Sequence, residues 1–259
     1  MYLCIDSGGT KISYAIFDEN FILKNEYVII MNGNYRLNQK EVENVFLKIF
    51  YDLTPTKVLI GMAGIYGMDK EIENFQKKNN IRIDIVSDIS LASLSINLKE
   101  GQILGMLGTG SVFYKDNRIE GGYGHLLGDE GSGYHFGKII LKKYLKLKQL
   151  NISNIITKEI EKNYGINSSR ELVPIIYISP KVEFSKLAKT FMDNENFRDL
   201  SNIFFEETSN YIDDFAAHKV YLSGSITNSI EFQKFIKKNK KNYEIVKIEM
   251  LDGIKNYEF

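Results

Sequence analysis

Two short glycine turns constrain most strongly what this chain can fold into. The first spans residues 6–11 (Asp-Ser-Gly-Gly-Thr-Lys), and the second spans residues 108–111 (Gly-Thr-Gly-Ser). Each turn lies between two apolar runs, which predicts a strand, a tight turn and a second strand. An ordinary hairpin turn is the alternative, but Asn-Gly or Asp-Gly would serve that purpose alone. Because adjacent glycines let backbone N–H groups approach an anion closely, we expect both turns to bind phosphate.

Polar residues beside the first turn extend this interpretation. Thr10 and Lys11 add hydrogen-bond donors and a positive charge. Asp6 ends the first apolar run, just before those donors. An acid in this position is well placed to hold a Mg²⁺ ion that bridges phosphates.

The order of predicted elements is similar in the two halves of the chain. The first half reads as strands 2–5, 12–17 and 22–30, a helix around 42–50, strand 57–60, helix 70–80, strand 81–86 and helix 90–98. From Gly101 come strands 103–107, 112–114 and 118–120, a glycine-dense loop 121–137, helices over most of 138–217, strand 219–222, helix 229–239 and strand 243–248. This order predicts a duplicated α/β architecture with mixed central sheets. We expect an N-terminal lobe at 1–100 and a C-terminal lobe at 101–259, with the last helix able to pack back on the first lobe.

Composition limits the partners of this chain. Its 259 residues include 33 Lys and Arg against 33 Asp and Glu. This balance gives no global field that would attract nucleic acid or an anionic membrane. No apolar stretch approaches the roughly 20 residues that span a bilayer, and no secretion signal is apparent. We therefore expect a cytoplasmic protein without nucleic-acid or membrane partners.

Asp88 is the candidate catalytic base. It follows the buried strand predicted at 81–86 and precedes a helix. An acid at the carboxyl end of such a strand faces the crevice of an α/β sheet. An enzyme that transfers a phosphoryl group to a hydroxyl group needs a carboxylate to take the proton of that hydroxyl. Asp88 is a candidate for this role. The alternative is a helix N-cap, and both roles can hold at once.

Together these segments resemble the actin-like ATPase and sugar-kinase superfamily. The resemblance is greatest to the N-acetylglucosamine kinase branch, which is grouped with the BadF/BadG/BcrA/BcrD ATPases. The segments that carry it are residues 6–11, 87–88, 108–111, 223–225 and the loop Gly-Gly-Tyr-Gly-His-Leu-Leu-Gly-Asp-Glu-Gly-Ser-Gly at 121–133. The resemblance implies a two-lobed, ribonuclease H-like duplicated fold with an interdomain cleft. The chain departs from the family in being shorter after residue 150 and in having Tyr123 where a Trp is usual.

The resemblance also implies a role for each matching residue. The residues implied to bind ATP are Gly8, Gly9, Thr10, Lys11, Gly108, Thr109, Gly110, Gly224 and Ser225, and Asp6 is implied to orient Mg²⁺. Those implied to contact the sugar are Asn34, Asp88, Ser111, Gly122, Tyr123, Gly124 and Asp129. Asn34 reads equally well as a surface-turn residue, and Ser225 as part of an ordinary strand-to-helix turn. His125 is expected to form structural hydrogen bonds.

The implied function is an ATP-dependent transferase that phosphorylates the 6-hydroxyl of an N-acetylated hexosamine. N-acetylglucosamine and N-acetylmannosamine both remain open, since the two differ only in stereochemistry at C2. The alternatives are an N-acetylmannosamine kinase of sialic-acid catabolism and a non-catalytic sugar sensor. Because Cys4 is the single cysteine, an iron–sulfur activase is excluded and a zinc-bearing glucokinase is disfavoured. A homodimer is expected from the resemblance alone.

Overall fold

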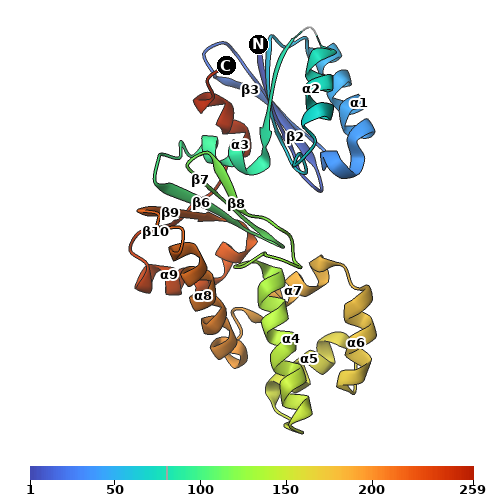
Figure 1. The fold of residues 1–259 in the computed structure, drawn as a ribbon, viewed down its shortest axis with the longest axis vertical. Coiled ribbons are helices and arrows are strands. Elements are labelled where there is room, and N and C mark those ends of the chain that lie inside the picture. The colour runs from blue at the N-terminus through green and yellow to red at the C-terminus, as the bar shows by residue number, and fades with distance from the viewer. Residues whose placement is uncertain (80) are drawn as a thin grey trace. The chain divides into compact units, whose positions relative to one another are not determined.

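The computed structural model describes residues 1–79 and 81–259, which form two compact units. Unit 1 comprises Met1–Lys99 together with Lys247–Phe259, and unit 2 comprises Glu100–Val246. Each unit is built on a five-stranded mixed sheet (Figure 1). The helix predicted at 70–80 ends in Asn80, which lies outside the described residues.

The sheet of unit 1 has the strand order β3-β2-β1-β4-β5. Its strands are β1 (Tyr2–Ser7), β2 (Ile12–Phe17), β3 (Leu23–Ile29), β4 (Lys57–Met62) and β5 (Arg82–Ser87). The first three strands are antiparallel neighbours, whereas β1, β4 and β5 run parallel. The register aligns Ser7 with Met62 and Met62 with Ser87. The parallel strands therefore end together at one edge of the sheet.

The two faces of this sheet carry different helices (Figure 1). Helices α1 (Tyr35–Leu53) and α2 (Asp69–Lys77) cover one face, and α3 (Asp88–Ser95) and the 3₁₀ helix η3 (Met250–Asn256) cover the other. Side chains of a strand alternate between faces. In β1, Leu3 and Ile5 accordingly join the core under α1 and α2, while Cys4 joins the core under α3 and η3. The C-terminal segment thus completes the second face of unit 1.

Leu91 of α3 packs into a space that two glycines leave open. A Cβ atom added at Gly61 of β4 would overlap the Leu91 side chain, and one at Gly253 of η3 would lie 2.7 Å from Leu91 Cδ1. The Leu91 side chain is fully buried. The absence of a side chain at both positions therefore lets α3 lie close to the sheet, with its first residue at the carboxyl edge.

The sheet of unit 2 repeats the first one in the order β10-β9-β6-β7-β8. Its strands are β6 (Gln102–Leu107), β7 (Ser111–Lys115), β8 (Arg118–Gly121), β9 (Lys219–Ser223) and β10 (Tyr243–Ile245). Again three consecutive strands are antiparallel, and the first of them pairs in parallel with a later strand. The two mixed sheets predicted from the sequence are confirmed.

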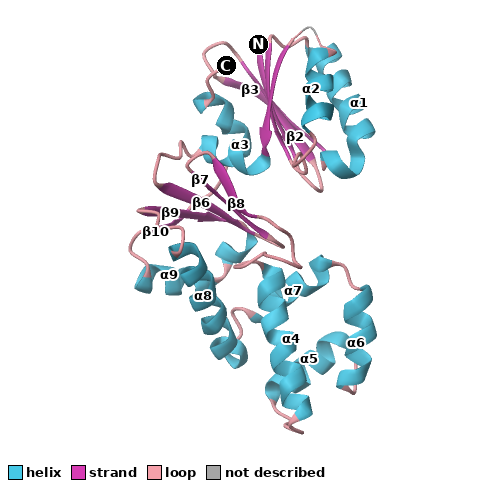
Figure 2. Ribbon diagram, in the orientation of Figure 1, coloured by secondary structure: helices cyan, strands magenta, loops and turns pink. Residues whose placement is uncertain are grey.

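Helices make up most of the rest of unit 2 (Figure 2). They are α4 (Gly133–Gln149), α5 (Ile155–Tyr164), α6 (Ser169–Ile178), α7 (Lys181–Phe191), α8 (Arg198–Asp213) and α9 (Ile230–Asn239), with the short 3₁₀ helices η1 (Glu195–Phe197) and η2 (Ser225–Asn228). Helices α4 to α7 gather beside one another, and one hydrophobic core joins them to the sheet through Phe113, Phe136 and Phe204.

Two local predictions differ from the structure, and one element was not predicted. The predicted loop 121–137 ends early, because Ser132 caps α4 by accepting a hydrogen bond from the His135 N–H, so the helix begins at Gly133. Strand β10 ends at Ile245, not at residue 248. The 3₁₀ helix η3 was not predicted, since its short glycine-containing sequence lacks a helical periodicity.

Within residues 1–79 and 81–259, no helix combines the length and apolar character that crossing a bilayer requires.

The close packing at Gly61 leads to a first prediction. Gly61→Ala should lower the free energy of unfolding of unit 1 by about 1–3 kcal/mol, because the new methyl group would overlap Leu91. Denaturant unfolding followed by circular dichroism would measure the change. Gly9→Ala is the matched control, since a Cβ there meets nothing within 4 Å. Equal stability of the two variants would contradict the close packing.

Candidate functional site

The first glycine turn joins β1 to β2. Hydrogen bonds fix its position on one side, and its other side is exposed. The Gly8 N–H donates to the Lys11 carbonyl at 3.0 Å, and the Gly33 N–H donates to the Gly8 carbonyl at 2.8 Å. The Ser7 hydroxyl donates to the Gly33 carbonyl at 2.8 Å, which ties the loop before α1 to the turn. A Cβ at Gly9 would meet nothing within 4 Å, and Gly9 and its two following residues are exposed. The turn is therefore fixed in position and open to a ligand.

Asp6 and Asp88 lie at the carboxyl edge of the sheet of unit 1. Asp6 belongs to β1, and Asp88 is the first residue of α3. Burial, together with the negative charge of Asp88, raises the pKa of Asp6 to about 6, and Lys11 opposes the rise. Burial also raises the pKa of Asp88, whose carboxylate accepts the Ile89 N–H at 2.8 Å. The two carboxylates are close enough to interact, and both bind protons more tightly than an ordinary aspartate.

Ser87, not Asp88, is the N-cap residue of α3. Its hydroxyl oxygen accepts a hydrogen bond from the Ser90 N–H at 3.1 Å. The alternative interpretation of Asp88 as the helix N-cap is therefore wrong. Because a serine caps the helix, the structure does not require a carboxylate at position 88 for that purpose.

The second glycine turn joins β6 to β7 and rests on the start of α4. The Gly108 N–H donates to the Gly110 carbonyl at 2.9 Å. The first N–H groups of α4 bind this turn: Gly133 donates to the Gly108 carbonyl at 2.8 Å, and Tyr134 donates to the Thr109 carbonyl at 3.3 Å. Helix α4 thereby satisfies N–H groups that the first turn of a helix leaves free.

Ser111 and Asp129 attach the second turn to the loop before α4. An Asp129 oxygen accepts the Ser111 N–H at 3.1 Å, and the Ser111 hydroxyl donates to the Glu130 carbonyl at 2.6 Å. The side chains of Asp129 and Ser111 are only 3% and 6% exposed. The Nζ atom of Lys181 lies 2.5 Å from Oδ2 of Asp129. Ser111 and Asp129, both predicted to contact the sugar, thus form hydrogen bonds or an ion pair with other residues of unit 2. The sequence did not indicate Lys181.

The loop at 121–128 presents the other predicted sugar contacts. Gly122 and Gly124 have φ angles of +69° and +80°, a region that glycine adopts without strain. The Tyr123 side chain between them is 70% exposed. The ring of His125 packs edge-on against Tyr134, with 5.0 Å between centroids. The loop therefore offers an exposed aromatic ring between two glycines.

Asn34 lies beside the first turn and caps α1. Its amide oxygen accepts the Leu37 N–H at 3.2 Å. A Cβ at Gly64 would overlap this amide, so Asn34 is held against the loop after β4. This N-cap role was not predicted from the sequence, although Asn is a preferred residue at that position.

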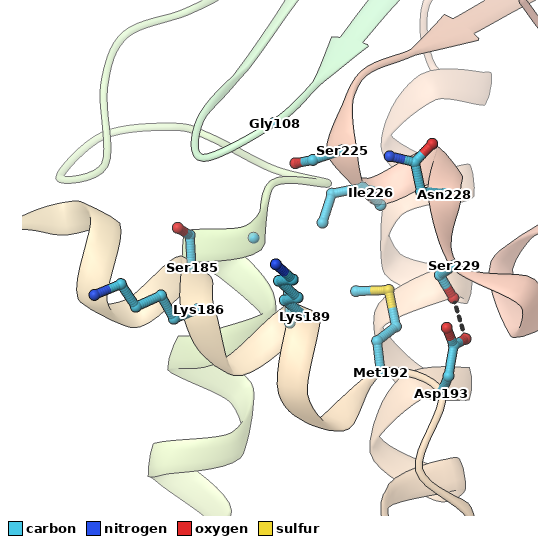
Figure 3. Close-up of a pocket in the computed structure, with 12 residues that line it drawn as sticks. Gly108, Ser185, Lys186, Lys189, Met192, Asp193, Ser225, Ile226, Asn228 and Ser229 are labelled. Atoms are coloured by element: carbon cyan, nitrogen blue, oxygen red, sulfur yellow. Dashed lines mark hydrogen bonds between the residues drawn. The ribbon is translucent and has the colours of Figure 1, made fainter. Parts of the chain in front are cut away.

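A cavity of about 410 Å³ lies beside the second turn within unit 2 (Figure 3). The predicted residues Gly108 and Ser225 both line it. Gly224 makes this proximity possible, because it has a φ of +109° and a Cβ there would overlap the Leu107 carbonyl. The cavity thus joins the second glycine turn to the Gly-Ser turn after β9.

Helix α7 and the segment after β9 supply the rest of the cavity lining. The residues that the sequence did not indicate include Ser185, Lys189, Met192, Asp193, Asn228 and Ser229. In Figure 3 the Lys189 side chain extends toward Ser225 and Ile226. The Ser229 hydroxyl donates to Asp193 at 2.6 Å, which ties the end of α7 to the start of α9. Apolar Met192 and Ile226 beside polar groups suit a ligand with an apolar ring and polar substituents.

The donor set of unit 1 fits a magnesium ion that is shared with phosphates. In the part of the chain that the structure describes, no three His, Cys, Asp or Glu side chains form a group that could hold a metal by themselves. Mg²⁺ usually binds one or two carboxylates together with substrate phosphates. Asp6 beside the open first turn is a suitable carboxylate of this kind.

No family model matches the chain. The N-acetyl-D-glucosamine kinase of Dictyostelium discoideum is 24% identical over 249 residues, which cover 83% of this chain and 77% of that protein. The N-acetylmuramic acid/N-acetylglucosamine kinase of Clostridium acetobutylicum is 33% identical over 117 residues, which cover 42% of this chain and 38% of that protein.

A solved structure shows the same fold. It is that of a protein from Chromobacterium violaceum provisionally named N-acetylglucosamine kinase. The TM-score is 0.74 at 15% identity, and the match covers 97% of this chain and 96% of that chain. The fold, two mixed five-stranded sheets with helices, is therefore like that of the actin-like ATPase kinase structures, as predicted. The chain is similar in sequence to N-acetylglucosamine kinases, and its homologues include sugar kinases.

The raised pKa values lead to a second prediction. A group whose pKa is higher in the folded than in the unfolded chain stabilises the fold below its unfolded pKa, and this contribution is lost as the pH rises through the folded pKa. For Asp6 that folded pKa is about 6. Asp6→Asn should therefore raise the unfolding free energy at about pH 8, by at most about 3 kcal/mol, with little gain at about pH 4.

Calorimetric unfolding of the variant and the wild type at both pH values would measure this difference. Asp52→Asn, at an exposed position on α1, is the control and should change stability little at either pH. A loss of stability in Asp6→Asn at the higher pH would contradict the raised pKa of Asp6.

Proposed function

We propose that this protein is an ATP-dependent amino-sugar kinase. It transfers the γ-phosphoryl group of ATP to the 6-hydroxyl of an N-acetylated hexosamine. The observation that carries the proposal is the pair of partly buried carboxylates, Asp6 and Asp88, beside an open glycine turn. The names of the two relatives support the same class of substrate.

Asp88 is the proposed general base. The sugar oxygen attacks the γ-phosphorus, the bond to the ADP oxygen breaks, and the hydroxyl proton passes to the Asp88 carboxylate. Burial raises the pKa of Asp88, which makes this carboxylate a stronger base. Asp6 is proposed to hold Mg²⁺, directly or through water. The ion would supply charge neutralisation for the phosphates.

The glycine turns are proposed to bind the nucleotide phosphates. In unit 1 these residues are Gly8, Gly9, Thr10 and Lys11, and in unit 2 they are Gly108, Thr109 and Gly110. The cavity beside the second turn, which Ser225 lines and Gly224 precedes in the chain, is proposed to accept the nucleoside. Its apolar and polar lining supports this assignment.

The proposed sugar contacts are Asn34, Asp88, Ser111, Asp129 and the loop segment 122–124. An exposed Tyr123 ring suits the apolar face of a hexose. We infer N-acetylglucosamine as the first substrate to test, because both relatives are named for it. N-acetylmannosamine is the alternative substrate. A cytoplasmic homodimer is proposed from the family resemblance alone, and sedimentation analysis would test the dimer.

The third prediction concerns turnover. Release of ADP should depend on an N-acetylhexosamine, and Asp88→Asn should lower kcat by about 10²- to 10⁴-fold, because it removes the proton acceptor. A coupled ADP-release assay would compare N-acetylglucosamine, N-acetylmannosamine, N-acetylmuramate and glucose. Asp52→Asn is the control, since Asp52 is an exposed aspartate on α1.

Two outcomes would contradict the kinase proposal. The first is ATP hydrolysis that no sugar stimulates. The second is sugar binding without turnover in the wild type, which would favour the sugar sensor. Full activity of Asp88→Asn would leave the kinase but overturn the assignment of the base.

A further inference from the structure

Helix α7 is held close to the second glycine turn by two glycines of α4. A Cβ at Gly137 would overlap the Phe184 carbonyl, and one at Gly133 would lie 2.9 Å from Ser185 Cβ. Both glycines therefore let the backbones of α4 and α7 approach each other. Gly133 also binds the second turn through its N–H. The position of α7 relative to that turn is thus fixed by packing within unit 2.

One face of α7 is directed toward the turn and the cavity beside it. Lys181, Ser185 and Lys189 are spaced by four residues, so they lie on the same side of the helix. The Ser185 hydroxyl lies 3.5 Å from the Thr109 hydroxyl, and Ser185 and Lys189 line the cavity (Figure 3). The Lys181 Nζ atom lies so close to Gly110 that a Cβ there would overlap it.

Lys181 supplies a positive charge that the second turn lacks in its own sequence. The first turn carries Lys11, whereas residues 108–111 include no basic residue. The ammonium group of Lys181 lies over the second turn instead. A Cβ atom at position 110 would overlap this nitrogen, so a larger residue there would displace the ammonium group.

Asp129 holds this ammonium group in place. Its Oδ2 atom is buried, lies 2.5 Å from Lys181 Nζ in an ion pair and has no hydrogen-bond partner among the described residues. Asp129 is 3% exposed, but the Lys181 side chain is 28% exposed. An ammonium group has three N–H donors. Lys181 can therefore remain bound to Asp129 and donate to a ligand on its exposed side.

We propose that Lys181 binds the β- and γ-phosphates of the nucleotide at the second turn, and that Asp129 is its positioning residue. This inference rests on the proposed ATP site and adds to it a residue from outside both glycine turns. The alternative is a structural ion pair in which Lys181 only balances the buried charge of Asp129.

The fourth prediction separates these two roles by nucleotide binding without sugar. Lys181→Gln should raise the Kd of ATP and ADP by about 10- to 100-fold and leave that of AMP nearly unchanged, because a hydrogen bond between charged groups is lost. Titration calorimetry would measure all three. Lys148→Gln is a matched control: Lys148 is also 28% exposed and pairs with Glu161 at 2.7 Å, toward the far end of α4.

Two further variants test the structural alternative. If Lys181 served only to balance Asp129, the double variant Asp129→Asn/Lys181→Gln would recover the wild-type affinity for ATP, and this result would overturn the proposal. We expect the double variant to stay weakened and Lys181→Arg to retain most of the affinity. A circular dichroism melt would confirm that each variant is folded.

The outcomes also distinguish this inference from the kinase proposal. Sugar turnover with an unchanged ATP Kd in folded Lys181→Gln would overturn the inference and leave the kinase standing. ATP binding that depends on Lys181, without turnover of any sugar, would support the inference and contradict the kinase. Absence of ATP binding in the wild type would overturn both.

Discussion

The packing of Leu91 against two glycines is the contact on which the candidate site of unit 1 depends. Gly61 and Gly253 leave room for this side chain between β4 and η3. That room sets the distance of α3 from the sheet and places Asp88 at the carboxyl edge. It also joins the C-terminal segment to unit 1. The same kind of packing occurs in unit 2, where Gly133 and Gly137 let α7 approach α4. In both units, close packing against glycine residues determines where a charged side chain lies.

The carboxylates so positioned oppose folding when they are ionised. Burial and like charge raise the pKa of Asp6, and burial raises that of Asp88. A fold selected for stability alone would not keep two such groups together. Perturbed acids beside an open turn are instead typical of a functional site. Ser87 supports this interpretation, because it caps α3 without help from Asp88.

Local patterns were sufficient to predict most of the fold. The alternating strands and glycine turns gave both mixed sheets, because hairpins are encoded by neighbouring residues. The start of α4 was missed, since Gly133 and Gly137 resemble loop residues until α7 packs against them. The N-cap of α3 was misassigned, since Ser and Asp are both good caps and stand side by side.

The candidate site was predictable only where its residues belong to a motif. The turns and the Gly-Ser segment after β9 were found in this way, and the structure brings Gly108 and Ser225 to one cavity. Lys181 and Lys189 had no such signal, because lysines on a helix usually face solvent. Their placement arises from tertiary packing. Similarly, the burial of Asp129 follows from its bonds to Ser111 and Lys181, which the sequence does not reveal.

Identification of the product tests the central claim most directly. The wild-type protein would be incubated with Mg²⁺, ATP and N-acetylglucosamine or N-acetylmannosamine, and the mixture followed by phosphorus NMR with proton correlation. We expect a phosphomonoester whose phosphorus couples to the two C6 protons of the sugar, formed in step with ADP. Inorganic phosphate and ADP without any sugar ester would contradict it.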